Sequence, residues 1–312
     1  LPLYKILDEL LTRNRLEKTA TLEFACIPAV IEIETAGMPF DSQKAGEILT
    51  EIESNITDLI SVLEVPNVNS SVQVLQKMLE LGQEYVKGSS FVIEDEEFEI
   101  SSSDEVLSRI KTRLPEDHPL AVFIANLQAY RHLKKKADML KKWLESVHPV
   151  TKRLHTSLKQ VNNQGVGRFS AREPNLQQIS REPEIRALFK AGPGKKLVLA
   201  DYSGIEMRIM AQLSKDKTLI KAFKDGVDIH KFTASRISGK PLDKVSKDER
   251  QAAKAVGFGM IYGMSSQTLK LYAETSYGVV MTEEEARKSR EGFFKAYPGI
   301  EKWHQKQTAL VS

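Results

Sequence analysis

RQAAKAVGFGMIYG, residues 250–263, carries the strongest structural signal in the chain. Arg250, Lys254, Phe258 and Tyr262 follow one another at intervals of four residues. At about 100° per residue, each interval drifts by about 40°, so the four side chains fan over roughly one third of a helix surface. Two cations followed by two aromatic rings suit a nucleoside triphosphate, because cations pair with phosphates and rings pack against sugar and base. An amphipathic helix whose basic side chains extend over apolar neighbours fits the spacing equally well.

A second signal is DYSGIEMR, residues 201–208, which directly follows the apolar run LVLA at residues 197–200. The run predicts a short buried strand, and the residues after the motif predict a helix. A carboxylate at the carboxyl end of a strand is a suitable ligand for Mg²⁺, and the main-chain carbonyl of Tyr202 can add an oxygen. Asp201 is also a good helix cap, and on this motif alone the cap is the favoured interpretation.

A third signal is the polar stretch GRFSAREPNLQQIS, residues 167–180. Hydrogen-bond donors in such a loop or edge strand suit the minor groove of a duplex, where purine N3 and pyrimidine O2 acceptors occur in every base pair. Donors there can test base pairing without reading sequence. On composition alone, an ordinary polar loop is favoured. The candidate donors are Arg168, Arg172, Asn175, Gln177 and Gln178.

Composition sets the general class of protein. The 312 residues are 41% hydrophobic and 28% charged, which is typical of a soluble globular chain of about two domains. A net charge of +3 is too small by itself to indicate a nucleic-acid partner. The single cysteine, Cys26, excludes a disulfide framework and a cysteine-built zinc site, and it fits a reducing cytoplasm. The apolar runs are too short to cross a bilayer, no signal-peptide pattern begins the chain, and Leu1 leads us to expect a start inside a longer polypeptide.

Two stretches have unusual charge. Residues 90–105 contain seven acids and no Lys or Arg, which predicts a solvated, mobile segment. Residues 119–147 carry apolar residues at helical spacing and predict a long helix. This helix is basic over 131–142, which fits either a solvated face or contact with a phosphate backbone. Its cations include Arg131, Lys134, Lys135, Lys136, Lys141 and Lys142.

Taken together, the three motifs resemble those of family A DNA polymerases, the bacterial DNA polymerase I type. DYSGIEMR resembles the first palm motif of that family, RQAAKAVGFGMIYG its fingers helix, and GRFSAREPNLQQIS the segment that contacts primer and template. Three joining segments also resemble the family: IRALF (185–189), DIHKFTA (228–234) and YPGIEKW (297–303). The resemblance extends from about residue 20 to the end of the chain.

The resemblance implies an α+β right-hand polymerase with palm, fingers and thumb, mostly helical with a small antiparallel palm sheet. The family's second catalytic carboxylate lies on a palm hairpin, in a His-Asp-Glu type motif, and no such motif occurs in these 312 residues. We therefore expect residues 1–312 alone not to polymerise DNA. The implied domains are residues 1–21 as the end of an exonuclease-like domain or a linker helix, 22–41 as the approach to the palm, 42–147 as the thumb, 148–213 as the palm with its metal-binding aspartate, and 214–312 as the fingers.

The resemblance also implies roles for single residues. Asp201 would be the catalytic carboxylate that binds two Mg²⁺ ions, with Tyr202 as a further metal ligand, and Lys254 and Glu206 would complete the catalytic set. Glu206 would lie under the sugar, exclude a ribose 2′-OH and hydrogen-bond Tyr262. The implied dNTP-binding residues are Tyr202, Ser203, Gly204, Ile205, Glu206, His230, Arg250, Lys254, Phe258 and Tyr262. The implied DNA-binding residues are Arg168, Arg172, Asn175, Gln177, Gln178, Lys134, Lys135 and Lys136.

Three positions depart from the family pattern. Gly257 stands where Asn is usual, Gly204 where Gln is common, and Gln251 where many members carry a second Arg. Interior glycines weaken a helix by about 1 kcal/mol each relative to Ala. We therefore expect Gly257 and Gly259 to loosen the closure of the fingers.

The implied function is template-directed DNA synthesis, in which dNMP from a dNTP is added to a primer 3′-OH and pyrophosphate leaves by a two-metal mechanism. The expected partners are primer–template DNA and dNTP, with no membrane. The expected state is a monomer in the cytoplasm or associated with the nucleoid, and a viral or organellar source stays open. Two alternatives are a catalytically incomplete DNA-binding fragment and a single-subunit RNA polymerase. Glu206 argues against the second, because a ribonucleotide enzyme needs room for the 2′-OH.

Overall fold

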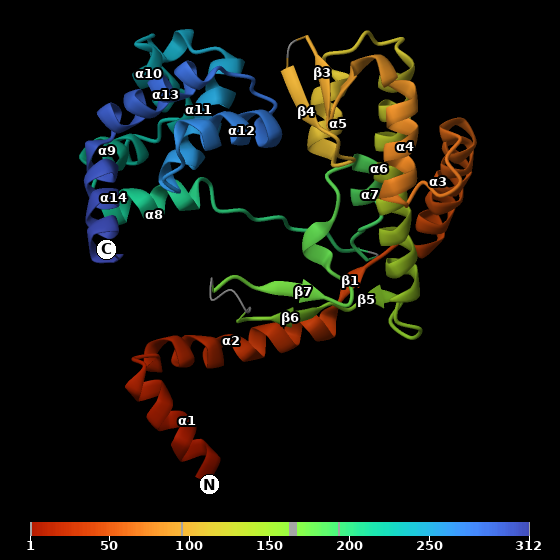
Figure 1. Ribbon diagram of the computed structural model, residues 1–312. Coiled ribbons are helices and arrows are strands. Elements are labelled where there is room, and N and C mark those ends of the chain that lie inside the picture. Colours follow the sequence, from red (N-terminus) through yellow and green to blue (C-terminus); the bar gives the residue numbers. More distant parts are fainter. Residues whose placement is uncertain (1, 95, 162–166, 193, 312) are drawn as a thin grey trace. The chain divides into compact units, whose positions relative to one another are not determined.

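The structure is a computed structural model that describes residues 2–94, 96–161, 167–192 and 194–311. Its residues group into two units (Figure 1). Each unit has a hydrophobic core of its own. The units divide within the apolar run 197–200, so the motif at 201–208 lies in the second unit although it was included in the predicted palm. The two units are Leu1–Val198 and Leu199–Ser312.

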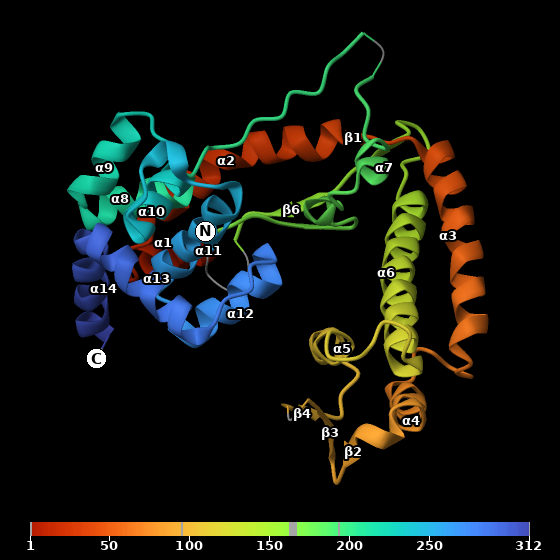
Figure 2. The same cartoon turned by 90° about the horizontal axis from the view of Figure 1, so that it is seen from above.

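Two long helices, α3 and α6, lie side by side in the first unit (Figures 1 and 2). α3 begins after Asp41, whose carboxylate accepts a hydrogen bond from the main-chain N–H of Lys44 over 3.0 Å. α6 confirms the helix predicted over 119–147, because most of its regularly spaced apolar side chains reach the core. The helices of this unit are α1 (Pro2–Arg13), α2 (Glu17–Ala36), α3 (Ser42–Leu63), α4 (Ser71–Leu81), α5 (Asp104–Lys111), α6 (Pro119–Glu145) and α7 (Pro183–Arg186).

The acidic stretch belongs to a folded antiparallel sheet with the strand order β2–β3–β4. Phe91 and Phe98 face each other across β3 and β4, and both rings are buried. Glu96 forms ion pairs with Arg109 and Arg113. The prediction of a mobile, solvated segment is therefore wrong for the described residues. The alternation of side chains along the strands buries both rings, and cations that follow the strands in the sequence offset the acids. The strands are β2 (Val86–Lys87), β3 (Ser90–Ile93) and β4 (Glu96–Glu99).

Two further antiparallel sheets have two strands each, β1 with β5 and β6 with β7. β6 lies along α2 (Figures 1 and 2). α2 holds this strand and the residue after it: Glu34 Oε1 accepts from the N–H of Leu158 over 2.5 Å, and the main-chain carbonyl of Glu23 accepts from Gln160 Nε2 over 2.8 Å. These short sheets fit the expected small antiparallel palm sheet. The strands are β1 (Met38–Pro39), β5 (Arg153–Leu154), β6 (Ser157–Lys159) and β7 (Ser170–Arg172).

The apolar run at residues 197–200 is not a strand. Val198 and Leu199 are 90% and 86% exposed. A strand needs a neighbour that satisfies its backbone N–H and C=O groups, and none of the strands in the described part of the chain pairs with this run. The prediction of a buried strand before Asp201 is therefore wrong here, because apolar composition indicates burial but does not supply a pairing partner.

All regular secondary structure described in the second unit is helical. Its core contains Met207, Leu219, Met260 and Phe293, each from a different helix. Tyr297 is also fully buried, and its hydroxyl shares a hydrogen bond of 2.9 Å with the hydroxyl of Thr233. The helices are α8 (Ile205–Ser214), α9 (Lys217–Lys224), α10 (Ile229–Ser238), α11 (Lys247–Ile261), α12 (Ser266–Tyr277), α13 (Glu283–Ala296) and α14 (Pro298–Val311).

Candidate nucleotide-binding site

The predicted row of cations and rings lies along α11 and ends at the residue that follows it. α11 begins with a capping box, in which Ser246 Oγ accepts from the N–H of Glu249 over 3.1 Å and Glu249 Oε2 accepts from the N–H of Ser246 over 2.9 Å. The opposite side of α11 is buried in the core. The remaining side keeps partly exposed side chains, which we call the α11 face: Arg250, Lys254, Phe258 and the exposed Tyr262.

The two interior glycines of α11 have different roles in packing. A Cβ atom at Gly259 would lie 2.8 Å from Leu269 Cδ1 and 3.3 Å from Met264 Sδ, so glycine lets α12 approach closely. A Cβ at Gly257 would meet Met207 Sδ at 3.9 Å, an ordinary contact. Packing therefore favours glycine at position 259 and leaves room for a Cβ at position 257.

His230 lies in the first turn of α10 and is placed by the carboxylate of Asp228. Asp228 Oδ1 accepts from the main-chain N–H groups of His230 and Lys231, each over 3.0 Å. Asp228 Oδ2 accepts from Arg250 Nε over 2.9 Å. One carboxylate therefore joins the start of α10 to the first residue of the α11 face.

Rings and charges surround the middle of the α11 face. The ring centroids of His230 and Phe258 lie 6.0 Å apart, and Lys254 Nζ lies 5.8 Å from the ring centroid of Tyr277. Burial lowers the pKa of His230, and the positive charge of Arg250 lowers this pKa further. His230 is therefore neutral at pH 7, and the cations here are Arg250 and Lys254.

The motif at 201–208 turns sharply before α8. Gly204 has φ +61° and occupies the N-cap position, so the helix begins at Ile205 and Asp201 does not cap it. Arg208 stabilises this turn, since its Nε donates to the carbonyl of Ser203 over 2.9 Å. Glu206, in the first turn of α8, accepts a hydrogen bond from the Tyr262 hydroxyl over 3.0 Å, which confirms the expected contact between them.

A cleft of about 370 Å³ lies beside these contacts in the second unit. The turn before α8 forms one wall, and the start of α10 with Arg250 forms the other. The guanidinium of Arg208 covers the ring of Phe223 within this lining, 4.5 Å from its centroid. The cleft is lined by Ser203, Gly204, Arg208, Phe223, Gly226, Val227, Asp228, Ile229, His230 and Arg250.

The residues predicted to bind metal are exposed and lie outside regular secondary structure. Asp201 offers a carboxylate and Tyr202 a main-chain carbonyl, and hard oxygen donors of this kind suit Mg²⁺. Among the residues that the structure describes, no three His, Cys, Asp or Glu side chains gather to hold an ion. The donor types therefore fit Mg²⁺, while these residues supply part of a ligand set.

Comparison with known proteins identifies the family. Residues 39–312 match the sequence model of DNA polymerase family A. The chain belongs to DNA polymerase family A. It is 33% identical to DNA polymerase I of Aquifex aeolicus over 294 residues, covering 92% of this chain and 47% of that protein. It is 38% identical to the thermostable DNA polymerase I of Thermus aquaticus over 211 residues, covering 66% of this chain and 24% of that protein.

A solved structure extends the likeness to three dimensions. The POL domain of Pol1 from M. smegmatis, in complex with DNA primer-template and dNTP, superposes with a TM-score of 0.76 at 28% identity. The match covers 96% of this chain and 52% of that one. The right-hand polymerase fold class is thereby confirmed. The chain spans about half the length of its Aquifex relative and less of the Thermus protein. No described helix is long and apolar enough to span a membrane.

In the segment expected to meet the minor groove, residues 167–180, some of the polar side chains form hydrogen bonds with the segment's own backbone. Gln177 Oε1 accepts from the N–H of Ala171 over 3.1 Å, and Gln177 Nε2 donates to the carbonyl of Phe169 over 3.0 Å. Asn175 Oδ1 accepts from the N–H of Gln177 over 3.0 Å. Gln177 and Asn175 therefore organise the loop. The predicted donors that are exposed are Arg168, Arg172, Gln177 and Gln178.

The basic part of α6 differs from the prediction at one lysine. Lys136 is buried, and its ammonium binds the carboxylates of Glu182 and Glu184. Burial alone would lower the pKa of Lys136, but its hydrogen bonds to both carboxylates raise it overall. Lys136 is thus a structural residue and is not available to a phosphate backbone. Lys134 pairs with Asp138, whereas Lys135 is exposed.

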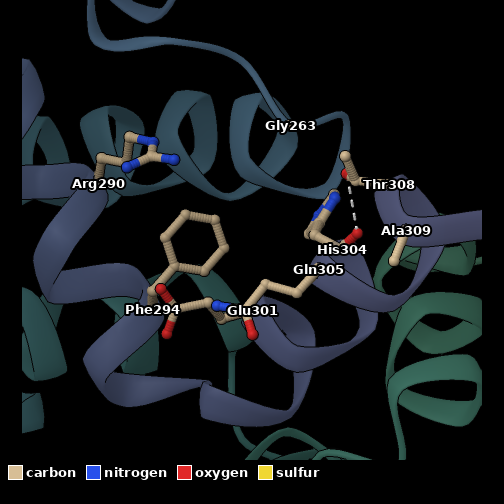
Figure 3. A pocket seen from close by; sticks show the side chains of 8 residues that line it. All are labelled: Gly263, Arg290, Phe294, Glu301, His304, Gln305, Thr308 and Ala309. Atoms are coloured by element: carbon tan, nitrogen blue, oxygen red, sulfur yellow. Dashed lines mark hydrogen bonds between the residues drawn. The ribbon is translucent and has the colours of Figure 1, made fainter. Parts of the chain in front are cut away.

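Sequence reasoning missed two features of the second unit. Asp228 precedes the helix of the DIHKFTA segment, and its N-cap position was a signal that could have been used. The second feature is an open pocket of about 580 Å³ beside Gly263, just after the α11 face (Figure 3). His304 lines this pocket and shares a hydrogen bond of 3.1 Å with the carbonyl of Met260, which ties α14 to the end of α11. No sequence pattern indicated this pocket.

Proposed function

We propose that the chain takes part in template-directed DNA synthesis, in which dNMP from a dNTP is joined to a primer 3′-OH and pyrophosphate is released. One observation carries the proposal: three helices are bonded together around the α11 face. Tyr262 bonds to Glu206 of α8, and Arg250 bonds to Asp228 at the start of α10. Family membership and the relative solved with DNA primer-template and dNTP support it.

In this proposal the α11 face binds the incoming nucleotide. Phosphoryl transfer depends mainly on positioning and on compensation of phosphate charge. Arg250 and Lys254 would supply the compensating charge. His230 is neutral at pH 7, so it would donate a hydrogen bond without adding a full charge. Phe258, next to the His230 ring, would pack against the sugar.

Glu206 would select the sugar. Its carboxylate is held by the Tyr262 hydroxyl, so it is oriented before a nucleotide binds. A ribose 2′-OH would need the volume that this carboxylate occupies. The arrangement therefore favours deoxyribonucleotides, and it favours a DNA polymerase over an RNA polymerase.

Asp201 and the main-chain carbonyl of Tyr202 would hold Mg²⁺, and two ions are expected for this class of reaction. When bound, Mg²⁺ supplies Lewis-acid stabilisation of the attacking and leaving oxygens. The chain contributes hard oxygen ligands immediately before the turn at Gly204, which Arg208 stabilises.

Primer–template DNA is the proposed macromolecular partner. The exposed donors Arg168, Arg172 and Gln178 would meet the minor groove, and the exposed Lys135 would meet the phosphate backbone. We propose a monomer in the cytoplasm or associated with the nucleoid.

Primer extension by the polymerase that contains these residues tests the proposal, with dNTP and rNTP offered in parallel. We expect Mg²⁺-dependent extension with dNTP. Asp201→Asn should abolish nucleotide addition and leave the Kd for primer–template within a few fold, because Asp201 is assigned to metal and not to DNA. Near-normal turnover of that variant would contradict the assignment. Equal use of rNTP would favour the RNA polymerase, and duplex binding without extension would favour a DNA-binding fragment.

A further inference from the structure

The carboxylate of Asp228 is bonded on both of its oxygens. Oδ1 caps α10 through the N–H groups of His230 and Lys231, and Oδ2 accepts from Arg250 Nε. Because a carboxylate is planar and rigid, these bonds tie the guanidinium of Arg250 to the start of the helix that carries His230. Both partners line the same cleft of about 370 Å³.

The hydrogen bond to Asp228 uses Nε of Arg250 and not its two terminal nitrogens. Among the described residues, Nε is the side-chain atom through which Arg250 donates a hydrogen bond. Its two terminal nitrogens can then form a paired contact with phosphate oxygens, the geometry in which guanidinium binds phosphate best. The Arg250 side chain is 38% exposed, so a ligand in the cleft can reach it.

We propose that Asp228 is a positioning residue for nucleotide binding, which sets the guanidinium of Arg250 relative to His230 so that both contact one triphosphate. The inference rests on the proposed function, and it adds a residue that acts through Arg250.

Electrostatics alone would argue against an acid at this place. A negative side chain next to a triphosphate repels it, so simple charge counting predicts that removing Asp228 tightens nucleotide binding. Burial would raise the pKa of Asp228, but hydrogen bonds from the main chain of Lys231 and from Arg250 lower it overall, so the carboxylate is ionised at pH 7. Positioning predicts the opposite result, because a guanidinium that is no longer oriented loses its paired contact. The sign of the change therefore separates the two explanations.

Two substitutions separate positioning from folding. Asp228→Ser keeps a good N-cap residue but is too short to reach Arg250. Asp228→Asn keeps the capping oxygen and presents an amide N–H₂ to Arg250 in place of Oδ2. The matched control is Asp41→Ser, because Asp41 also caps a helix through Oδ1 and pairs with a cation, Lys190, through Oδ2 over 2.6 Å.

The experiment measures dNTP binding to the polymerase that contains these residues, with inorganic triphosphate as a competitor. We expect both Asp228 variants to weaken both ligands by about ten-fold, the size of one lost charge-assisted hydrogen bond. The Kd for primer–template and the unfolding temperature should stay near the wild-type values, and Asp41→Ser should leave dNTP binding unchanged. Unchanged or tighter dNTP binding in the Asp228 variants would overturn the inference.

A double-mutant cycle with Arg250→Ala identifies which idea fails if a result is negative. Once Arg250 is absent, Asp228→Asn should cause no further loss of dNTP affinity. If Arg250→Ala itself leaves dNTP affinity unchanged, the proposed role of the α11 face is wrong. If Arg250→Ala weakens binding and the two losses simply add, the α11 face stands and the positioning role of Asp228 is wrong. If the Asp228→Ser variant does not fold, the Asp228→Asn variant and this cycle still test the positioning role of Asp228.

Discussion

The hydroxyl of Tyr262 donates a hydrogen bond to Glu206 Oε1 over 3.0 Å, and this bond joins the end of α11 to the first turn of α8. The two residues are 56 positions apart in the sequence. The residue proposed to select the sugar is therefore oriented by the helix that carries the proposed triphosphate ligands. A movement of α11 would change both functions together.

Glu206→Ala should raise the use of rNTP relative to dNTP by about ten-fold or more, because it removes the group that occupies the 2′-OH volume. Tyr262→Phe is the matched variant, since it keeps the carboxylate and removes the bond that orients it. We expect a smaller rise for Tyr262→Phe. Single-nucleotide incorporation, expressed as kcat/KM for each nucleotide, measures both effects. Unchanged sugar discrimination in Glu206→Ala would remove this residue from sugar selection.

Neighbouring lysines of α6 should respond differently to alanine substitution. Lys136→Ala should lower the free energy of unfolding by about 2 kcal/mol, because it leaves Glu182 and Glu184 without their shared cation. Lys135→Ala should leave stability unchanged and weaken duplex binding, with the salt dependence of log Kd reduced by about one unit of slope. Urea unfolding and a salt titration of DNA binding test the pair. The reverse pattern would show that Lys136 and not Lys135 faces DNA.

The two glycines of α11 offer a test of packing. Gly257→Ala should stabilise the protein by up to about 1 kcal/mol, because alanine favours the helix and its Cβ meets Met207 Sδ at an ordinary 3.9 Å. Gly259→Ala should destabilise it by about 1–3 kcal/mol, because its Cβ would lie 2.8 Å from the buried Leu269 side chain. Urea denaturation of the two variants gives the comparison. Equal effects would mean that α12 moves freely away from α11.

His230 should make stability depend on pH. Burial and then the charge of Arg250 hold the pKa of His230 below its ordinary value of 6.5. The unfolded chain therefore binds this proton more readily than the folded chain as pH falls. The stability contributed by the neutral ring is fully present above about pH 6.5 and decreases below it.

His230→Gln removes this titration. The free energy of unfolding should therefore fall less in the variant than in the wild type when the pH is lowered from about 7.5 to about 5.5, across the ordinary histidine pKa of about 6.5. His132→Gln is the comparison, because the His132 side chain is 64% exposed on α6, where its Nε2 lies 3.4 Å from a carboxylate oxygen of Glu182 and not in a buried site. Urea unfolding at both pH values gives the difference. An identical pH dependence in wild type and His230→Gln would show that His230 is not buried in its neutral form.

The α11 face was predictable from residues alone because its pattern is local. Helical geometry places Arg250, Lys254, Phe258 and Tyr262 on one side whatever the rest of the chain does. The capping box at Ser246 starts the helix through atoms only three residues apart. Motifs of this kind also carried the family resemblance, and the resemblance in turn implied the bond between Glu206 and Tyr262, which are 56 positions apart.

Two predictions that rested on composition failed because the outcome depended on distant partners. The apolar run 197–200 had strand composition, but a strand forms only where another strand supplies hydrogen bonds. The acidic stretch had the composition of a solvated segment, but Phe98 meets Phe91 across the sheet and Arg131 of α6 binds Asp104 over 2.8 Å. Composition counts the charges of a segment without showing which cations fold back onto it.

Lys136 and Asp228 show, for single residues, the difference between what local sequence indicates and what packing decides. Periodicity placed Lys136 on a basic helix, yet only folding brings Glu182, 46 positions away, onto its ammonium and removes it from the solvent. Asp228 was visible as a residue before a helix, yet its second oxygen meets Arg250 only because α10 and α11 pack together. Helical period and capping act within a few residues and can be read along the chain, whereas burial and charge pairing depend on distances that exist only after the helices have packed.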